Sequence, residues 1–551
     1  MGLKIFYYEN EPNTRQDSEP REVLSGFYPA KGLYPRAGLY PRAIGTGPII
    51  ENLQKDGNEW HGYSLCCPRF ALLNGDYINL PQNPLPYGYV SSQVSDADGN
   101  FSNNPRLNIN LKYKISTIGL TFTFNAYSGD HPKLMRVDWM ADGMTLSSKQ
   151  VEINADEVFI ENEVEAYNQL NIVLIGTNKP YRPAFLMQIE YGRIREYADE
   201  VDSSNCMQEL STISEEISVN TADWTIRQEE GIAAPRFKKK QKASLYFDDL
   251  MIGSFYLKSG YRKNIFDYFF SAEDAIGILS GSEFFGGIYE DYPFINLIQD
   301  IFKGEEFRYL VDEDIQYISM NGYIPYCTKR DALVQAAFAI GAIVTTAFYD
   351  GIRIYKPKTA ETPKQIQKSE TLSYPSLENA DIVTGVRVTT HRYLPSEDED
   401  ELYNDTLSGT AQVIFSEPYH DLAITGGSIV SSDTNYAVIK GSGTVKLTGK
   451  KYTHLTASLL KENPLINYNK NIKEVKDATL VNNDNGQAVL DRVYDYYLKP
   501  ESVEARIVLN DRQLGDTVTI DTVFDGTRQG ILERLDYSFA KGIVAEATIH
   551  E

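Results

Sequence analysis

The chain has 551 residues, 42% hydrophobic and 12% aromatic, enough to bury several cores and to exclude general disorder or a disulfide-stapled miniprotein. Its 53 basic and 76 acidic residues leave a net charge of −23, which disfavours any broad surface for DNA or anionic lipid. The four cysteines form no CxxC pair, so neither a zinc site nor a redox motif is predicted. The length predicts three or four domains, and we expect no export signal in the first residues.

The first predicted region, residues 1–105, is extended and rich in turns. Between residues 26 and 43 it contains three consecutive hexapeptides, each with glycine first and proline fourth. Such spacing prevents a helix, because proline recurs every six residues, and favours an extended chain that lays Tyr34 and Tyr40 on a neighbouring surface. We interpret the segment as a docking arm or linker. A local loop within a folded N-terminal lobe is the alternative.

Residues 106–197 are predicted to form a β-sandwich. Short apolar runs separated by Gly, Asn, Asp and Pro, with no helix between them, are typical of this architecture. Met135, Val137 and Trp139 share one strand parity, so Trp139 is assigned to the core rather than to a sugar-binding platform. The predicted strands cover residues 109–115, 120–124, 134–139, 151–153, 158–160, 170–175 and 185–191.

One loop in this region is a candidate ligand site. Residues 127–131 read Tyr-Ser-Gly-Asp-His and follow a predicted strand, which places Tyr127, Asp130 and His131 together at a strand end. Aromatic and polar side chains in such a position suit a ligand. A plain turn is the simpler interpretation of the same residues.

The remainder of the chain mixes strands and helices. Apolar stripes predict helices at residues 294–302 and 486–498, and a third begins at an N-cap Thr328 and ends at Gly341. Strands follow at 342–349 and 352–355, joined across Asp350-Gly351 as a two-residue type I′ turn. The acidic run 397–401 is predicted to be an exposed loop, because five like charges repel unless they are hydrated. The chain closes with strands that are able to complete a small barrel, at residues 505–509, 517–520, 530–539 and 543–549.

The sequence contains no recognisable catalytic constellation. Its six histidines never lie within four residues of each other, which excludes the helical metalloprotease motif. No metal, cofactor or catalytic residue is predicted. Carboxylate pairs for glycoside hydrolysis stay open, because their separation depends on the fold. The uncharged stretch 332–348 is 17 residues long and is interrupted by polar residues and glycine, so it is not predicted to span a membrane.

Several phrases resemble tail proteins of phages and prophages that infect Gram-positive hosts. They cover about residues 198–551, and the last two are similar to the final barrel strands of baseplate hub proteins. The phrases begin at Ser254 (SFYL), Asp274 (DAIGIL), Gly286 (GGIY), Gly322 (GYIP), Arg330 (RDALVQAAFAIGA), Leu514 (LGDTVTI) and Gly530 (GILER).

The resemblance implies a trimeric hub in which each subunit contributes two barrel-like domains. Three subunits then match a hexameric tail tube on one side and a three-fold spike or fibre on the other, and the family needs no active site. The chain departs from the minimal pattern by about 190 extra N-terminal residues, whose sandwich resembles galactose-binding carbohydrate modules more weakly. A C-terminal lysin domain is not recognisable, so the resemblance does not support a tail-associated lysozyme or peptidase.

These observations predict a mainly β fold with α+β insertions: a β-sandwich followed by two hub-type β-barrel domains. The predicted parts are residues 1–105, the sandwich 106–197, a first barrel 198–290, an insertion 291–375 and a second barrel 376–551. We expect a non-enzymatic structural component of the virion tail tip or baseplate, made in the host cytoplasm. Expected partners are two further copies of the chain, a tail tube or distal tail protein, a tape measure protein, and spike or fibre proteins. A host cell-wall glycan stays open as a further partner, and DNA is expected to pass an acidic lumen without specific binding. The alternatives are a carbohydrate-binding adhesin and a polysaccharide hydrolase.

Overall fold

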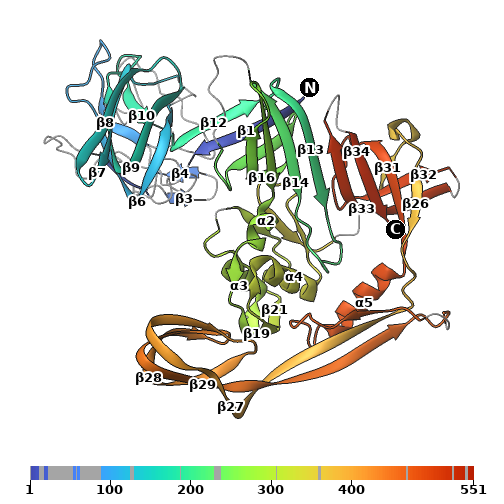
Figure 1. Cartoon of the computed structure of the whole chain (residues 1–551). Helices are drawn as coiled ribbons and strands as arrows, with labels where there is room; N and C mark the ends of the chain where they lie inside the picture. The colour runs from blue at the N-terminus through green and yellow to red at the C-terminus, as the bar shows by residue number, and fades with distance from the viewer. Residues whose placement is uncertain are drawn as a thin grey trace. The chain divides into compact units, whose positions relative to one another are not determined.

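The computed structural model describes most of the chain, and strands dominate it, as the predicted mainly β fold requires (Figure 1). The chain forms two compact units: unit 1 is Met1–Tyr7 with Glu196–Glu551, and unit 2 is Tyr8–Arg195. No described helix is long and apolar enough to cross a membrane. The described residues are 2–10, 18–22, 54–56, 59–61, 89–124, 129–186, 188–228, 237–305, 307–357, 362–466, 470–523, 526–539 and 544–551.

Unit 2 is built on a sheet in the order β11-β6-β9-β7-β8, with β2 also beside β6, and a separate β5–β10 ladder. Met135, Val137 and Trp139 are fully buried, which confirms the parity argument that places Trp139 in the core. Ala184 and Leu186 from the ladder pack into the same core. The strands are β2 (Ser18–Glu22), β5 (Tyr89–Val94), β6 (Arg106–Thr123), β7 (Leu134–Ala141), β8 (Met144–Glu152), β9 (Glu157–Ile175), β10 (Pro183–Leu186) and β11 (Gln188–Glu190).

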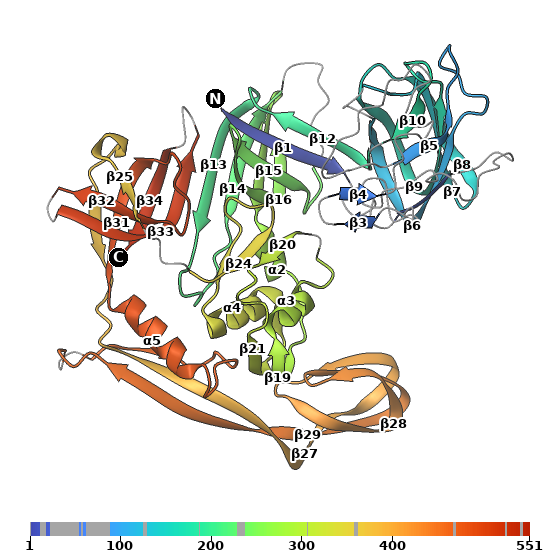
Figure 2. The same cartoon turned by 180° about the vertical axis from the view of Figure 1, so that it is seen from behind.

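Unit 1 contains one long sheet whose strands come from distant parts of the chain. Its order includes β1-β15-β16-β17-β14-β13-β33-β34-β31-β26, with β32 beside β33 and β25 beside β32 (Figure 2). The segments 198–290 and 376–551, predicted as two barrels, therefore contribute to the same sheet, and β13 joins β33 between them. The strands are β1 (Leu3–Asn10), β13 (Val201–Glu209), β14 (Thr221–Arg227), β15 (Lys242–Phe247), β16 (Leu250–Arg262), β17 (Asp267–Glu273), β25 (Lys364–Ile366), β26 (Ser376–Asn379), β31 (Glu501–Val508), β32 (Thr517–Thr522), β33 (Gly526–Ser538) and β34 (Val544–His550).

A helical insertion follows β17. The predicted helices are confirmed as α3 (Phe294–Phe302), α4 (Lys329–Ile340) and α5 (Gly486–Tyr497), and a short α2 (Ala275–Ser280) was not predicted. The Thr328 hydroxyl accepts a bond from the Asp331 amide at 3.1 Å, so the predicted N-cap is also correct. Gly341 ends α4 in the left-handed conformation, at φ 70°.

The predicted type I′ turn at Asp350-Gly351 is wrong. The hairpin strands are β23 (Ile343–Thr345) and β24 (Ile352–Tyr355), so a longer loop joins them. Side-chain bonds hold this loop away from the ladder: the Thr346 hydroxyl donates to Asp274 at 2.6 Å, and Ser254 donates to Asp350 at 2.6 Å. Tertiary contacts thus override the local turn signal.

A long ribbon, here called the arm, extends from the base of α5. It consists of β27 (Gly385–Ile414), β28 (Tyr419–Asp433) and β29 (Tyr436–Glu462), with β30 (Ile472–Val475) beside β27 (Figure 1). The acidic run 397–401, predicted as a loop, lies within β27 instead. Opposing lysines explain the difference, because Lys450 contacts Glu397 at 2.6 Å and Lys446 contacts Glu401 at 2.9 Å. These pairs remove the repulsion on which the loop prediction depended.

Candidate functional site

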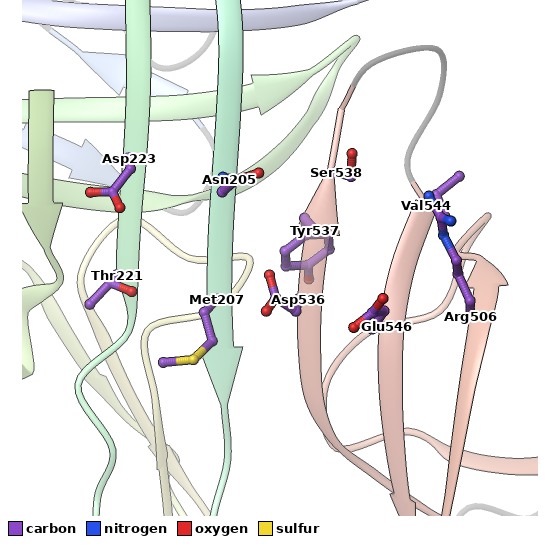
Figure 3. Close-up of a pocket in the computed structure, with 10 residues that line it drawn as sticks. All are labelled: Asn205, Met207, Thr221, Asp223, Arg506, Asp536, Tyr537, Ser538, Val544 and Glu546. Atoms are coloured by element: carbon purple, nitrogen blue, oxygen red, sulfur yellow. The ribbon is translucent and has the colours of Figure 1, made fainter. Parts of the chain in front are cut away.

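Unit 1 has a polar groove where its two sets of strands meet, shown in Figure 3. Register places Thr221, Met207, Asp536, Glu546 and Arg506 in one row across β14, β13, β33, β34 and β31. Because alternate residues of a strand point to opposite faces, residues in one such row share a face.

A second row runs beside the first. Asp223, Asn205, Ser538 and Val544 are cross-strand neighbours on β14, β13, β33 and β34. Together with Tyr537 beneath them, the two rows line a groove of 420 Å³. We call the nine residues of these two rows the polar face.

The intervening residues of the same strands form the core of the sheet. Cys206, Trp224, Tyr537 and Ala545 are almost completely buried and belong to one hydrophobic cluster. The Tyr537 hydroxyl donates to Gln208 Oε1 at 3.0 Å, and Gln208 donates to the Ile252 carbonyl at 2.9 Å. The Tyr537 hydroxyl and the Gln208 amide below the groove are therefore paired, and they tie β33 to β13 and β16 under the polar face.

The polar face is acidic. It carries the carboxylates of Asp223, Asp536 and Glu546 against one guanidinium, from Arg506. Burial raises the pKa of the Cys206 thiol well above its usual range. The negative charges of Asp536, Asp274 and Asp223 add smaller increases to this pKa. That thiol is consequently neutral and unreactive.

The described residues that line the groove supply three carboxylates, the Ser538 hydroxyl and the Tyr537 hydroxyl, and they include no histidine, lysine or thiol. Across the described part of the chain, no group of three His, Cys, Asp or Glu side chains is arranged to hold a metal ion. What the polar face offers is an acidic, hydrated surface on a continuous sheet.

The structure describes only part of the predicted ligand loop. Asp130 is buried and lies 3.2 Å from the Lys179 ammonium and 3.4 Å from the Arg182 guanidinium. The His131 amide donates to Asn178 Oδ1 at 3.1 Å. The Asp130 carboxylate is thus neutralised from within unit 2, as expected of a group that fixes a loop. Ligand binding there stays a prediction.

The other predicted site residues, Tyr127, Tyr34 and Tyr40, lie outside the described residues. The polar face itself was not predicted. Its signal was present in the alternation of β13 and β33, where Cys206 and Tyr537 alternate with Asn205, Asp536 and Ser538. Nothing local indicated that these two strands are neighbours.

Comparisons with known proteins find similarity only among solved structures. No protein-family model and no curated protein sequence matches the chain. The similar structures include several tail proteins. One, from Neisseria meningitidis MC58, is 10% identical over 65% of this chain and 94% of its own, with a TM-score of 0.43. The 43 kDa tail protein of prophage MuSo2 from Shewanella oneidensis is 8% identical over 64% and 95%, with a TM-score of 0.39. The prophage tail protein gp18 from Listeria monocytogenes EGD-e is 11% identical over 64% and 91%, with a TM-score of 0.38.

Proposed function

We propose that the protein is a non-enzymatic structural component of a phage tail tip, a baseplate hub that assembles as a trimer. The observation that carries the proposal is the β13–β33 junction, which fuses strands from residues 201–273 and 501–550 into one sheet with an acidic outer face. Two strand sets in one subunit give a trimer six such sets, and this number suits the symmetry of a hexameric tube.

The polar face is assigned to the central channel. Carboxylates repel the phosphates of passing DNA, and without a basic surface no counterions are released to drive binding. In this proposal the rim of the ring contacts a tail tube or distal tail protein, a tape measure protein, and spike or fibre proteins. Unit 2 is assigned to host-surface or baseplate contacts.

The mass of the purified full-length chain tests the proposal. A trimer of about 187 kDa is expected from the 62.2 kDa subunit, measured by sedimentation or native mass spectrometry. A chain that stays monomeric and binds cell-wall glycan by itself would be an adhesin instead. Cleavage of that glycan, abolished by a single Asp or Glu change, would establish a hydrolase.

A charge reversal on the polar face sharpens the test. Glu546→Lys changes an exposed residue on the proposed channel wall, and Asp398→Lys makes a matched change on an exposed residue of the arm. Both variants are expected to fold and to trimerise. Only Glu546→Lys should retard duplex DNA that is threaded through or mixed with the trimer, and equal effects of the two variants would remove the polar face from the channel.

A further inference from the structure

Two histidines form an unusual pair at the base of the arm. His391 of β27 and His454 of β29 are diagonal cross-strand neighbours, because His391 faces Thr456 and His454 faces Tyr393. His391 Nδ1 lies 2.9 Å from His454 Nε2, a hydrogen-bond distance. One imidazole N–H therefore donates a hydrogen bond to the facing nitrogen of the other ring.

The geometry identifies a shared proton rather than a metal chelate. The ring centroids are 5.1 Å apart and the ring planes are only 13° from parallel. With the nitrogen atoms 2.9 Å apart, the two rings lie end to end in nearly one plane, and their facing lone-pair directions point at each other. Two imidazoles that chelate a metal instead aim both lone pairs at a third point.

The pair lies where the arm meets the insertion. The His391 amide donates to the Val481 carbonyl at 2.8 Å, and the neighbouring Thr390 hydroxyl donates to Asn483 at 3.0 Å. On the other strand, His454 stacks on Tyr393 with centroids 4.4 Å apart, and Tyr393 in turn packs on Tyr323 of β21 (Ser319–Ile324) at 4.9 Å. The two rings thus join β27 to β29, while the His391 amide, Thr390 and Tyr393 connect this part of the arm to the elements beneath it.

Proton uptake changes this contact in two steps. A neutral pair and a singly protonated pair each keep one N–H between the two nitrogen atoms. In the singly protonated pair, the positive charge strengthens this hydrogen bond. A second proton places two N–H groups and two like charges face to face, and the bond is lost. His391 is buried whereas His454 is exposed, so solvent has direct access to one partner.

The surrounding charges do not cancel this response. Burial, followed by the charge of His454, lowers the pKa of His391, whereas the Lys476 backbone and the Asp477 carboxylate raise it by less. A lowered histidine pKa means that its stabilising contribution is complete at neutral pH and is lost as the pH falls below about 6.5. The other charged groups facing the pair from neighbouring elements are Glu290, Arg392 and Asp484, and Glu417 acts on Tyr393.

We propose that the His391–His454 pair is an acid-sensitive latch between β27 and β29, at the place where the arm contacts β21. The latch is closed at neutral pH and opens when both rings are protonated. It needs no ligand or partner, and it makes the pairing of the two strands at this point responsive to pH.

Amide hydrogen exchange of the full chain tests the latch. At about pH 5, the amides of residues 389–393 should exchange about tenfold faster than at about pH 7.5, after correction with an unstructured reference peptide. His391→Asn keeps an amide donor near the position of Nδ1 but does not titrate, so its exchange should be independent of pH. His420→Asn removes a histidine of β28 outside the pair and should behave like the wild type.

Three results would overturn the proposal. The first is corrected exchange in the wild type that is equal at the two pH values, which needs no variant. The second is a pH response in His391→Asn as large as in the wild type, and His454→Gln provides an independent variant if the first does not fold. The third is loss of the response in His420→Asn.

Discussion

Arg492 ties the end of one helix to another. Its guanidinium, on α5, donates to the Phe338 carbonyl in the last turn of α4 and lies over the Phe338 ring at 5.3 Å. Burial lowers the pKa of Arg492 to about 10, so the group stays charged at neutral pH. A cation at this position gives a second donor to a carbonyl that also accepts from the Gly341 amide at 3.3 Å, and it complements the negative end of the α4 dipole.

Gly341→Ala tests this tie. A Cβ at residue 341 would lie 2.6 Å from Arg492 Nη1, and the residue has φ +70°. We expect a loss of about 1 kcal/mol for the backbone and about 1–2 kcal/mol more for the displaced guanidinium, measured by urea unfolding. Gly304→Ala is the matched control, because Gly304 has φ +83° with nothing within 4 Å of its Cβ. Equal losses in the two variants would show that Arg492 moves without cost.

Asp274 is a buried carboxylate at the N-terminus of α2. It accepts bonds from the amides of Ile276 and Gly277 and from the Thr346 hydroxyl, yet burial dominates and raises its pKa to about 6. A raised carboxylate pKa gives a contribution to stability that is complete below about pH 4 and is lost as the pH rises past about 6.

Asp274→Asn should remove this dependence. The amide oxygen still caps α2, so the variant is expected to fold. Between about pH 4 and pH 7.5, the free energy of unfolding of the wild type should fall by up to about 3 kcal/mol more than that of the variant, measured by urea unfolding at each pH. Parallel pH profiles would mean that Asp274 is ionised at little cost.

At the scale of elements, a buried amide helps to hold the far part of the arm, beside the packing of Tyr436 on Phe285 at 4.4 Å. Asn435, fully buried between β28 and β29, donates to the carbonyls of Phe285 and Ile324 at 2.6 and 2.9 Å and accepts from the Tyr323 hydroxyl at 2.9 Å. The side chain thus satisfies three groups that would otherwise be unpaired.

Asn435→Ala should loosen the arm without unfolding the sheet. Each unpaired buried group costs about 1–3 kcal/mol, so amides of β28 and β29 are expected to exchange at least about tenfold faster. Asn404→Ala is the control, because Asn404 is exposed and bonds only to the nearby Glu401 at 3.0 Å among the described contacts. If the amides of β28 and β29 exchange at the same rate in Asn435→Ala as in the wild type, other contacts hold the arm in place.

Elements specified by nearby residues were predictable, and elements specified by distant ones were not. Helix α3 and the limits of α4 follow from an apolar stripe, Thr328 and Gly341, all local signals. In contrast, β6 and β9 were each predicted as two strands, because a bulge at Ala166, with φ 53°, interrupts the alternation while the Ser116 hydroxyl accepts its amide at 3.0 Å. The predictions of a type I′ turn at Asp350 and of a loop at residues 397–401 were wrong, because the partners of these segments, Ser254 and Lys450, are remote in sequence.

The polar face was not predicted for the same reason, because it depends on strands that are remote in sequence. Alternation along β13 and β33 predicts one polar face for each strand, but the pairing of Met207 with Asp536 crosses more than three hundred residues. No periodicity in a single sequence encodes such a neighbour. The groove therefore required the structure, whereas its acidic character was already visible in the net charge of −23.

At the scale of the whole molecule, net charge makes assembly dependent on salt. If three copies turn their polar faces to one channel, like charges oppose association, and ions screen this repulsion. The trimer should therefore become tighter from low salt to about 0.5 M, measured by sedimentation equilibrium. Asp536→Asn with Glu546→Gln should reduce the dependence, and Asp398→Asn on the arm should not. Weaker association in high salt would show that attractive ion pairs dominate the interface.

The pairing of β13 with β33 also imposes a delay during synthesis of the chain, because β13 is made long before β33. A ribosome adds roughly 5–20 residues per second, so β13 emerges on the order of half a minute before the strand that covers its edge. During that interval the exposed backbone of β13 is open to wrong partners, and a chaperone that shields it would raise the yield. A nascent chain released before residue 526 lacks β33 and β34, and therefore lacks the strand that pairs with β13.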